Sequence, residues 1–381
     1  MPRDRDHYEI LERLATGGMA EILLAREHGH AGFQRLVVLK RLLPALAASA
    51  DGASALLEEG RLMARLSHPS IVRVLRITTL DGAPALVLEH VEGMTLRALI
   101  DARRPGRLDL RVALTVGRSI AEALAYIHEL TDELGRPFGI VHRDINPTNV
   151  LVGIGGSVQV ADFGIARAET RALQTQTGIL KGTLGYMAPE QLVASGEIDW
   201  HADVYGLGAV LYELTTAAPA FDATDPGALV RLVREARFAR PRELEPSLGE
   251  ELERLILACL APAPEARPSA RDVATLLAKE LARFGPAPTV LEIAAHVQSV
   301  SADRRSTGPA GDQRARAPRA PVTTPVAARS LRALETDPVT TASGSITATR
   351  RISTSAAVLI AIAAVVLAGA VSYAIGVALG R

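Results

Sequence analysis

The chain has 381 residues, of which 48% are hydrophobic and 22% charged, so it holds enough apolar material for one large domain or two smaller ones. Lys+Arg and Asp+Glu both number 42, and this balance excludes the strong basic excess of a nucleic-acid-binding protein. The one cysteine, Cys259, excludes an internal disulfide and fits a reducing compartment; its helical pattern is typical of a core residue.

The N-terminal part of the chain opens with charged residues and no apolar run, so we expect no secretory signal there. Residues 14–22 then read L-A-T-G-G-M-A-E-I, a glycine-containing loop between two apolar runs. A strand is expected at residues 37–40, which end in Lys40. A helix follows, in which Glu59 lies beside the packed face; its neighbour Glu58 stays an alternative for the same position.

Three short motifs occur in a fixed order in the second half of the folded region. Residues 141–149 read V-H-R-D-I-N-P-T-N, residues 162–164 read D-F-G, and residues 182–190 read G-T-L-G-Y-M-A-P-E. Further along, Asp203 stands in D-V-Y-G-L-G and Arg267 in E-A-R-P-S. Any one of these motifs could arise by chance, but their order and separation together could not.

With the V-V-L-K strand before them, these motifs resemble the protein-kinase family, in particular the bacterial eukaryotic-like (Hanks-type) Ser/Thr kinases. The resemblance covers residues 8–284. It implies an α+β, bilobal protein-kinase fold, with a small β-rich lobe over residues 8–91, a larger helical lobe over residues 92–284, and ATP in the cleft between them.

The resemblance also implies a catalytic role for five residues. Asp144 would accept the proton of the substrate hydroxyl and orient it for in-line attack. Lys40 would contact the α- and β-phosphates and would itself be fixed by Glu59. Asn149 and Asp162 would hold Mg²⁺, a hard cation that prefers oxygen ligands.

The nucleotide-covering loop departs from the family's G-x-G-x-x-G-x-V pattern. Ala15 and Ala20 replace the first and third glycines, and an alanine disfavours positive φ, so we expect a stiffer loop or a less close approach to the phosphates. Residues 86–91 resemble the hinge that binds adenine through its backbone, with Leu88 as the gatekeeper. The resemblance assigns nucleotide contacts to Leu14, Ala15, Thr16, Gly17, Gly18, Met19, Ala20, Ile22, Val38, Lys40, Glu89 and Val91.

A second departure concerns the catalytic loop, where Asn146 replaces the lysine that usually contacts the γ-phosphate. Asparagine donates a hydrogen bond but brings no charge, which puts the rate in question and leaves a membrane-anchored pseudokinase scaffold as the alternative function. Retention of the lysine, the two aspartates and the second asparagine of these motifs favours an active enzyme that uses ATP and Mg²⁺; these residues are Lys40, Asp144, Asp162 and Asn149. Residues 182–190 argue against a small-molecule phosphotransferase, and Gly182-Thr183 resembles the Ser/Thr type more than the tyrosine type.

Regulation and structural support follow from the same resemblance. Arg143 before Asp144 is a feature of kinases whose activation segment is ordered by phosphorylation, and we predict autophosphorylation at Thr175 or Thr177. Thr183 is expected to pack at the catalytic loop. The resemblance further pairs the glutamate of A-P-E with an arginine near the end of the domain and gives a buried aspartate the task of holding the catalytic-loop backbone. These residues are Glu190, Arg267 and Asp203.

The C-terminal quarter of the chain differs from the rest in amino-acid composition. Apolar spacing is compatible with a terminal helix over residues 285–301, and residues 302–352 are Ala/Pro/Thr/Arg-rich, which predicts a disordered linker. Residues 356–379 carry no charge, and about 24 helical residues span about 36 Å, enough for a hydrocarbon core of about 30 Å. Arg350 and Arg351 precede this segment, so the positive-inside tendency places the kinase domain in the cytoplasm.

The expected protein is therefore a single-pass protein of the inner cell membrane. Its expected partners are protein substrates bearing Ser or Thr and the lipid bilayer, with no nucleic acid. Confinement to the membrane raises the encounter rate between copies, which makes a homodimer plausible.

Overall fold

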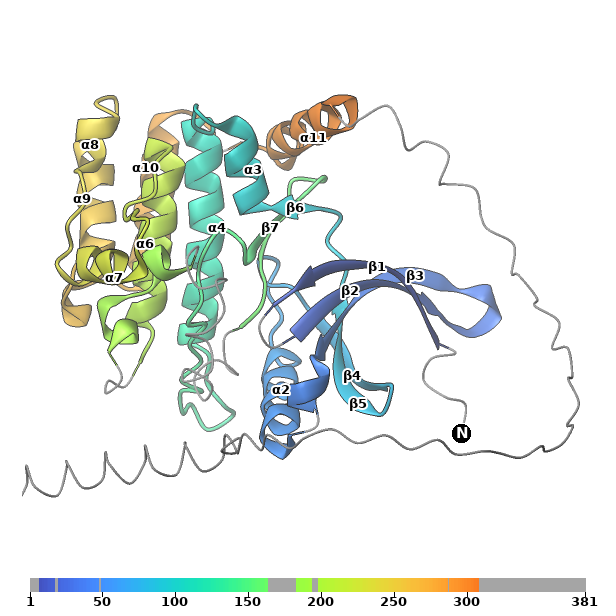
Figure 1. Cartoon of the computed structure of the whole chain (residues 1–381). Coiled ribbons are helices and arrows are strands. Elements are labelled where there is room, and N and C mark those ends of the chain that lie inside the picture. Colours follow the sequence, from blue (N-terminus) through green and yellow to red (C-terminus); the bar gives the residue numbers. More distant parts are fainter. Residues whose placement is uncertain are drawn as a thin grey trace, which may run out of the picture. The chain divides into compact units, whose positions relative to one another are not determined.

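The computed structural model describes residues 7–17, 20–47, 49–163, 183–193, 198–286 and 288–307, all of which belong to a compact unit spanning Met1–Asp312. Within this unit a strand-rich N-terminal part is followed by a helix-rich C-terminal part (Figure 1). This arrangement agrees with the α+β, bilobal expectation.

The N-terminal part is a five-stranded antiparallel sheet with the order β1-β2-β3-β5-β4. Alternate residues along β2 are buried, as expected for a strand with one face against a core. That face packs around Tyr8, Leu23, Val37, Leu39 and Val87. The strands are β1 (Tyr8–Thr16), β2 (Ala20–His28), β3 (Gln34–Leu42), β4 (Val74–Leu80) and β5 (Ala83–Glu89), with a short 3₁₀ turn, η2 (His30–Gly32), before β3.

Helices α1 (Pro44–Ala47) and α2 (Ala50–Met63) follow β3, and α2 packs on the other face of the sheet. The Ser49 side chain caps α2 by accepting a hydrogen bond from the Gly52 N–H. At Gly60 the helix approaches the sheet so closely that a Cβ atom would lie 2.5 Å from Leu86 Cδ2. The glycine therefore allows α2 to lie close to the sheet, and this brings the preceding residue, Glu59, close to β3.

A second, three-stranded antiparallel sheet lies at the junction of the two parts and has the order β6-β7-β8. Its strands are β6 (Gly93–Thr95), β7 (Val150–Gly153) and β8 (Val158–Val160). Val72, which leads into β4, donates its N–H to the Val160 carbonyl, and Val160 donates its own to the Ser70 carbonyl. Because β7 begins at the end of residues 141–149, this sheet fixes where that loop leaves the helical part.

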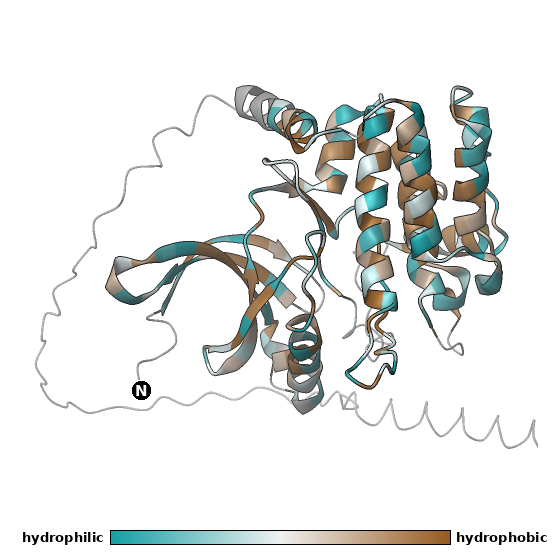
Figure 2. Cartoon of the chain, turned by 180° about the vertical axis from the view of Figure 1, so that it is seen from behind, coloured by the Kyte–Doolittle hydropathy of each residue, from teal (hydrophilic) through white to brown (hydrophobic). Residues whose placement is uncertain are grey.

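The helical part has α6 at its centre, with nearly every side chain buried. Its apolar surfaces face one another and its polar surfaces face outward (Figure 2). The helices are α3 (Leu96–Arg103), α4 (Leu110–His128), α6 (His201–Thr216), α7 (Pro226–Arg234), α8 (Pro241–Leu244), α9 (Glu250–Cys259) and α10 (Ala270–Arg283), with 3₁₀ turns η5 (Leu184–Tyr186), η6 (Pro189–Leu192) and η7 (Pro264–Ala266). Cys259 is fully buried in this core.

The last described helix, α11 (Val290–Thr307), lies against α3 and β7 (Figure 1). Val297 and Val300 are buried, and Gln298 Nε2 donates to the Ile154 carbonyl over 3.2 Å. The helix continues six residues past the predicted end at 301, so the predicted linker start at 302 falls inside it. The buried apolar residues hold the part of the helix that lies within the predicted bounds against the domain.

Within the described ranges, no helix combines the length and apolar character that a bilayer crossing requires. The predicted membrane segment over residues 356–379 lies outside those ranges, as does the predicted linker from residue 308 onward.

Candidate active site

Three charged side chains from separate elements converge beside β3. The Lys40 ammonium lies 2.6 Å from Glu59 Oε1 of α2 and 3.3 Å from Asp162 Oδ1. Burial alone lowers the pKa of Lys40, but the carboxylates of Asp162 and Glu59 outweigh it and raise the pKa, so the group stays a cation. Glu58 is exposed, and of the two candidates the structure pairs Glu59 with the lysine.

The Asp144 carboxylate is held by two side-chain amides. Asn149 Nδ2 donates to its Oδ2 over 2.6 Å, and Asn146 Nδ2 donates to its Oδ1 over 3.1 Å. Both amides also donate to the Asp144 carbonyl oxygen. Because each oxygen of the carboxylate receives a fixed donor, its orientation is set before any substrate arrives, as a positioned proton acceptor requires.

Asn146 has a structural function that the sequence analysis missed. Its side-chain oxygen accepts hydrogen bonds from the Thr148 N–H over 2.9 Å and from the Thr148 hydroxyl, and the residue is 2% exposed. Asn146 thus joins the turn at Thr148 to the Asp144 carboxylate. The available signal was a short polar side chain able to bond to backbone two residues away.

The backbone of the catalytic loop is anchored to α6 by hydrogen bonds. Asp203 is 1% exposed and accepts the N–H groups of His142 over 2.7 Å and of Arg143 over 2.6 Å. Arg143 has a φ of +67°, a left-handed conformation that a non-glycine residue adopts at a cost. The two charge-assisted hydrogen bonds hold it there, so the predicted contact of Asp203 with the loop is present.

His142 links the catalytic loop to the segment that carries Asp162. Its Nε2–H donates to the Ala161 carbonyl over 3.1 Å, and its Nδ1 accepts the Asp144 N–H over 3.3 Å. The ring packs on Phe163, with centroids 4.6 Å apart. Burial lowers the pKa of His142 more than the nearby carboxylates raise it, which keeps the imidazole neutral and able to accept at Nδ1.

The predicted metal ligands offer the oxygen donors that Mg²⁺ prefers. The nitrogen of the Asn149 amide is bonded to Asp144, so its oxygen is the atom that would face a cation, and the Asp162 side chain is 41% exposed. No group of three or more His, Cys, Asp or Glu side chains suited to a metal occurs in the described ranges. Mg²⁺ keeps several waters and substrate phosphates as ligands, so two protein oxygens fit its needs.

The nucleotide loop is built from the ends of β1 and β2. Ala15 pairs with Ile22, and Gly17 donates its N–H to the Ala20 carbonyl over 2.8 Å. Neither Ala15 nor Ala20 has a positive φ, so the strands accept a methyl group at both positions without strain. The two alanines therefore impose no backbone strain, while the predicted effect on the approach to the phosphates stays a prediction. Of the predicted contacts in this loop, Leu14, Thr16 and Ile22 also lie on these strands, whereas Gly18 and Met19 lie outside the described residues.

The predicted hinge follows β5. Val38 of β3 pairs with Leu88, and Glu89 comes next in the strand, two residues before Val91. The Glu89 carboxylate accepts from the Arg73 N–H and from Gln159 Nε2, each over 2.8 Å. Any contact of Glu89 with a nucleotide is therefore made by its backbone.

The A-P-E segment is fixed from two sides. Arg267, 4% exposed, binds Glu190 through both guanidinium nitrogens over 2.6 and 2.9 Å, as predicted. Gln191 Nε2 donates to the Arg143 carbonyl over 2.8 Å and so joins this segment to the catalytic loop. Thr183 is the N-cap residue that precedes η5, whereas Gly182, Thr170, Thr175 and Thr177 lie outside the described residues.

Comparison with known proteins decides the family. A family profile described as "Protein kinase domain" matches residues 8–276, more than two thirds of the chain. The chain belongs to the protein kinase family. The kinase domain defined by this match ends before α11, which begins at Val290.

Two relatives and one solved structure illustrate the similarity. The chain is 40% identical over 290 residues to a protein named Tyrosine-protein kinase MasK from Myxococcus xanthus, covering 74% of this chain and 44% of MasK. It is 36% identical over 270 residues to Serine/threonine-protein kinase PknB from Mycolicibacterium smegmatis, covering 69% and 41%. The chain thus spans less than half the length of these relatives. The crystal structure of the Mycobacterium tuberculosis PknI kinase domain superposes with a TM-score of 0.54 at 28% identity, covering 72% of this chain and 96% of that one.

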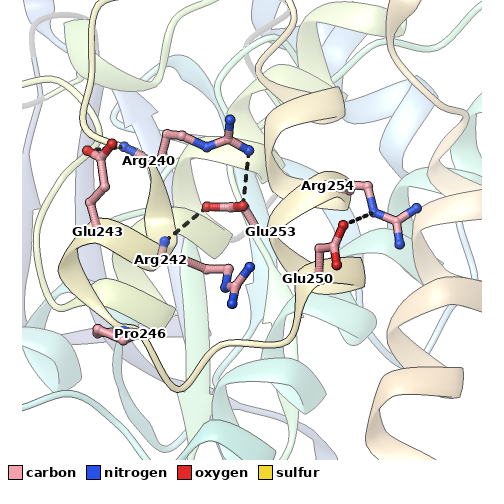
Figure 3. A pocket seen from close by; sticks show the side chains of 7 residues that line it. All are labelled: Arg240, Arg242, Glu243, Pro246, Glu250, Glu253 and Arg254. Atoms are coloured by element: carbon pink, nitrogen blue, oxygen red, sulfur yellow. Dashed lines mark hydrogen bonds and ion pairs between the residues drawn. The ribbon is translucent and has the colours of Figure 1, made fainter.

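The kinase also has a depression of about 510 Å³ on the helical part, around α8 and the start of α9 (Figure 3). Its charged side chains pair among themselves: Arg240 Nη2 lies 3.0 Å from Glu253 Oε2, and Arg254 lies 3.9 Å from Glu250. None of the predicted site residues lines it, and its balanced charges indicate no particular ligand. It is lined by Arg240, Arg242, Glu243, Pro246, Glu250, Glu253 and Arg254.

Proposed function

We propose that this protein kinase transfers the γ-phosphate of ATP to Ser and Thr hydroxyls of protein substrates. The observation that carries the proposal is the pairing of Lys40 with Glu59 and Asp162, beside an Asp144 carboxylate held by two amides. In this arrangement the Lys40 ammonium binds phosphate oxygens, and Asp144 orients the acceptor hydroxyl and takes its proton. Bound Mg²⁺, with Asn149 and Asp162 as its ligands, would supply charge neutralisation at the phosphates.

A direct transfer assay tests this proposal. The purified full chain, in detergent, is incubated with γ-labelled ATP, Mg²⁺ and a protein acceptor, beside the variant Asp144→Asn. Asp272→Asn is the matched control, because Asp272 is an exposed aspartate in the first turn of α10. We expect transfer by the wild type and the control and loss of at least about 100-fold in Asp144→Asn, the usual scale for a positioned proton acceptor. Equal activity in all three proteins would refute the assignment of Asp144.

The alternative function, a pseudokinase scaffold, is suggested by Asn146 in place of lysine. It can be separated from an active kinase by lysine labelling, since the chain has three lysines, Lys40, Lys181 and Lys279. An ATP acyl-phosphate probe should acylate Lys40, and excess ATP·Mg²⁺ should block this. Lys279 on α10, whose side chain is 61% exposed, gives the background reaction in the same tube. Labelling of Lys40 without phosphate transfer would identify a nucleotide-binding pseudokinase, and no selective labelling would identify a non-binding one.

The acceptor hydroxyl is the second open question, because MasK is named a tyrosine-protein kinase whereas PknB is named a serine/threonine-protein kinase. The resemblance of Gly182-Thr183 to the Ser/Thr type favours Ser and Thr. Hydrolysis of the labelled products and separation of phosphoserine, phosphothreonine and phosphotyrosine decides between them. Phosphotyrosine as the main product would overturn this part of the proposal.

Autophosphorylation at Thr175 or Thr177 is a further part of the proposal, and Arg143 supports it. In the part of the chain that the structure describes, Arg143 Nε is buried without a hydrogen-bond partner, and a phosphate group would satisfy it. Mass spectrometry after incubation with ATP should find one of the two threonines modified in the wild type and neither in Asp144→Asn. An active enzyme without either modification would refute this site.

We propose a membrane location from the sequence of residues 356–379, which carry no charge and follow Arg350 and Arg351. The kinase domain would then face the cytoplasm at the inner membrane, where it could form a homodimer. Carbonate extraction of membranes tests the anchor: the full chain should stay in the pellet, and a chain ending at residue 352 should not. Crosslinking in the membrane, before and after dilution with lipid, tests the dimer.

A further inference from the structure

Helix α11 lies outside the matched kinase domain but packs against it. The match ends at residue 276, whereas α11 begins at Val290. Ile293, Val297 and Val300 are all buried, and they belong to the apolar core of the helical part. Residues at this spacing form one stripe along a helix, so α11 binds the domain through one continuous face.

Two arginines of the helical part hold α11 in register. Arg103 of α3 donates from Nη2 to Ser299 Oγ over 2.7 Å. Arg111 of α4 donates from Nη2 to the Pro286 carbonyl over 2.6 Å, and its Nη1 lies 3.6 Å from Glu292 Oε1. Apolar burial has no preferred direction, whereas these polar contacts have fixed partners. They therefore specify where α11 lies on the domain.

Helix α11 also contacts the turn between β7 and β8. Gln298 Nε2 donates to the Ile154 carbonyl over 3.2 Å. Gly156 of the same turn lies against the first residue of α11, because a Cβ atom at Gly156 would be 1.9 Å from the Val290 carbonyl oxygen. The turn is thus in contact with both the start and the middle of the helix.

The same turn is bonded to the predicted nucleotide site. The Ile154 N–H donates to the carbonyl of Glu92, the residue directly after the predicted hinge contact Val91, over 2.8 Å. Three residues before Ile154, Leu151 of β7 packs in one apolar cluster with Val38 and Val91, two of the predicted nucleotide contacts. Ile154 therefore accepts a hydrogen bond from α11 at its carbonyl and holds the end of the hinge through its N–H.

We propose that α11 positions the nucleotide site: the docked helix raises the affinity of the kinase for ATP·Mg²⁺, and bound nucleotide in turn holds α11 on the domain. This inference rests on the proposed function, because it needs the ATP site. The docked helix binds the arrangement in which the turn, β7 and the hinge are joined, so it increases the population of that arrangement. Linkage requires the same factor in both directions. Helix α11, docked or released, is the two-state element that both contacts bias.

The experiment uses the full chain in detergent and a non-hydrolysable ATP analogue with Mg²⁺. Isothermal titration calorimetry gives the Kd of the analogue, and amide hydrogen exchange reports the docking of α11. Val297→Asp places a charge on the buried face of α11 and should release it, whereas Ala295→Asp places the same charge on its exposed face and is the matched control. We expect a Kd about tenfold weaker in Val297→Asp and unchanged in Ala295→Asp. In the wild type, the analogue should slow exchange in α11 by the same factor.

Folding is checked separately from docking. Circular dichroism, a melting curve and unchanged exchange in α6 show that a variant keeps its core, and fast exchange in α11 shows that the helix is released. If Val297→Asp fails to fold or to release α11, Gln298→Ala removes only the contact with Ile154 and should weaken the Kd by about two- to fivefold, the scale of one hydrogen bond.

The outcomes distinguish this inference from the proposed function. A weaker Kd in Val297→Asp without phosphate transfer by the wild type would support the role of α11 and refute the kinase activity. Phosphate transfer combined with an unchanged Kd after release of α11, or with exchange in α11 that the analogue does not slow, would overturn the inference and leave the proposed function standing. No binding of the analogue by the wild type would overturn both.

Discussion

The catalytic loop depends on a neutral amide at Asn146, and Asn146→Asp tests this with almost no change in shape. The substitution replaces an N–H donor with a carboxylate oxygen about as close to Asp144 Oδ1 as the present 3.1 Å. Two unit charges at that separation repel by about 5 kcal/mol at an effective dielectric constant of about 20. The carbonyl of the new side chain can still accept from Thr148, so the change acts mainly on Asp144.

The folded variant can relieve the repulsion by binding one proton, and this fixes the size of the effect. A carboxyl group with an ordinary pKa of about 3.9 needs about 4 kcal/mol to stay protonated at pH 7 and about 1.5 kcal/mol at pH 5. The cost of keeping one carboxyl group protonated is at both pH values smaller than the repulsion energy, so the two carboxyl groups share one proton. The pKa of the pair is therefore higher in the folded state than in the unfolded state. The protonated group donates to Asp144 as the amide did. The variant should therefore lose about 4 kcal/mol of stability at pH 7 and recover about 1.4 kcal/mol for each pH unit toward acid.

Urea unfolding of wild type and variant at pH 5, 6 and 7 measures this slope. Protonation of other groups such as His142 affects both proteins, so it cancels in the difference. Asn146→Ala is the control: it loses the contacts to Asp144 and Thr148, at about 1–3 kcal/mol, but its difference from wild type should not depend on pH. The reasoning is refuted if Asn146→Asp matches the wild type at pH 7, or if its deficit is the same at pH 5 and pH 7.

Three further outcomes are expected. Cys259 is buried, which raises the pKa of its thiol to about 12, so Ellman's reagent at pH 8 should leave it unmodified until urea unfolds the protein; rapid reaction of the native protein would contradict this. Arg267→Ala leaves the Glu190 carboxylate without its bidentate partner and should lower the free energy of unfolding by about 3–5 kcal/mol, with Arg267→Lys losing less; a shift below 1 kcal/mol would be inconsistent with the pair. Gly156 has a φ of +86°, and a Cβ there would lie 1.9 Å from the Val290 carbonyl oxygen. Gly156→Ala should therefore speed amide hydrogen exchange in α11 but not in α6. Unchanged exchange would show that α11 does not rely on this contact.

The sequence was sufficient to predict the contacts that are tied to a motif. Lys40 with Glu59, Asp203 with the catalytic loop, and Glu190 with Arg267 each join residues whose neighbours identify them. These pairs can be predicted although their members lie far apart along the chain, because the family resemblance gives the pairing itself. The β-rich and helical parts followed from the same resemblance.

The contacts that the sequence did not reveal are those made outside the motifs. Arg97 and Glu213 are 116 residues apart, and nothing around either marks it as half of a buried pair. In the sequence, Asn146 in place of lysine indicates only a lost charge, since its hydrogen bonds to Asp144 and Thr148 need the folded turn. Helix α11 is held by side chains buried against the domain, a tertiary effect that composition does not report.

Helix α3 brings several of these unpredicted contacts together. Its arginine at position 97 reaches Glu213 and Pro147, while Arg103 Nη2 donates to Ser299 Oγ of α11 over 2.7 Å. The same short helix is therefore bonded to the catalytic loop on one side and, on the other, to a helix that lies beyond the matched kinase domain. Because α3 has only eight residues, a displacement at its α11 side cannot be absorbed far from its active-site side. We therefore expect a change in the position of α11 to alter the orientation of Arg97 over Glu213.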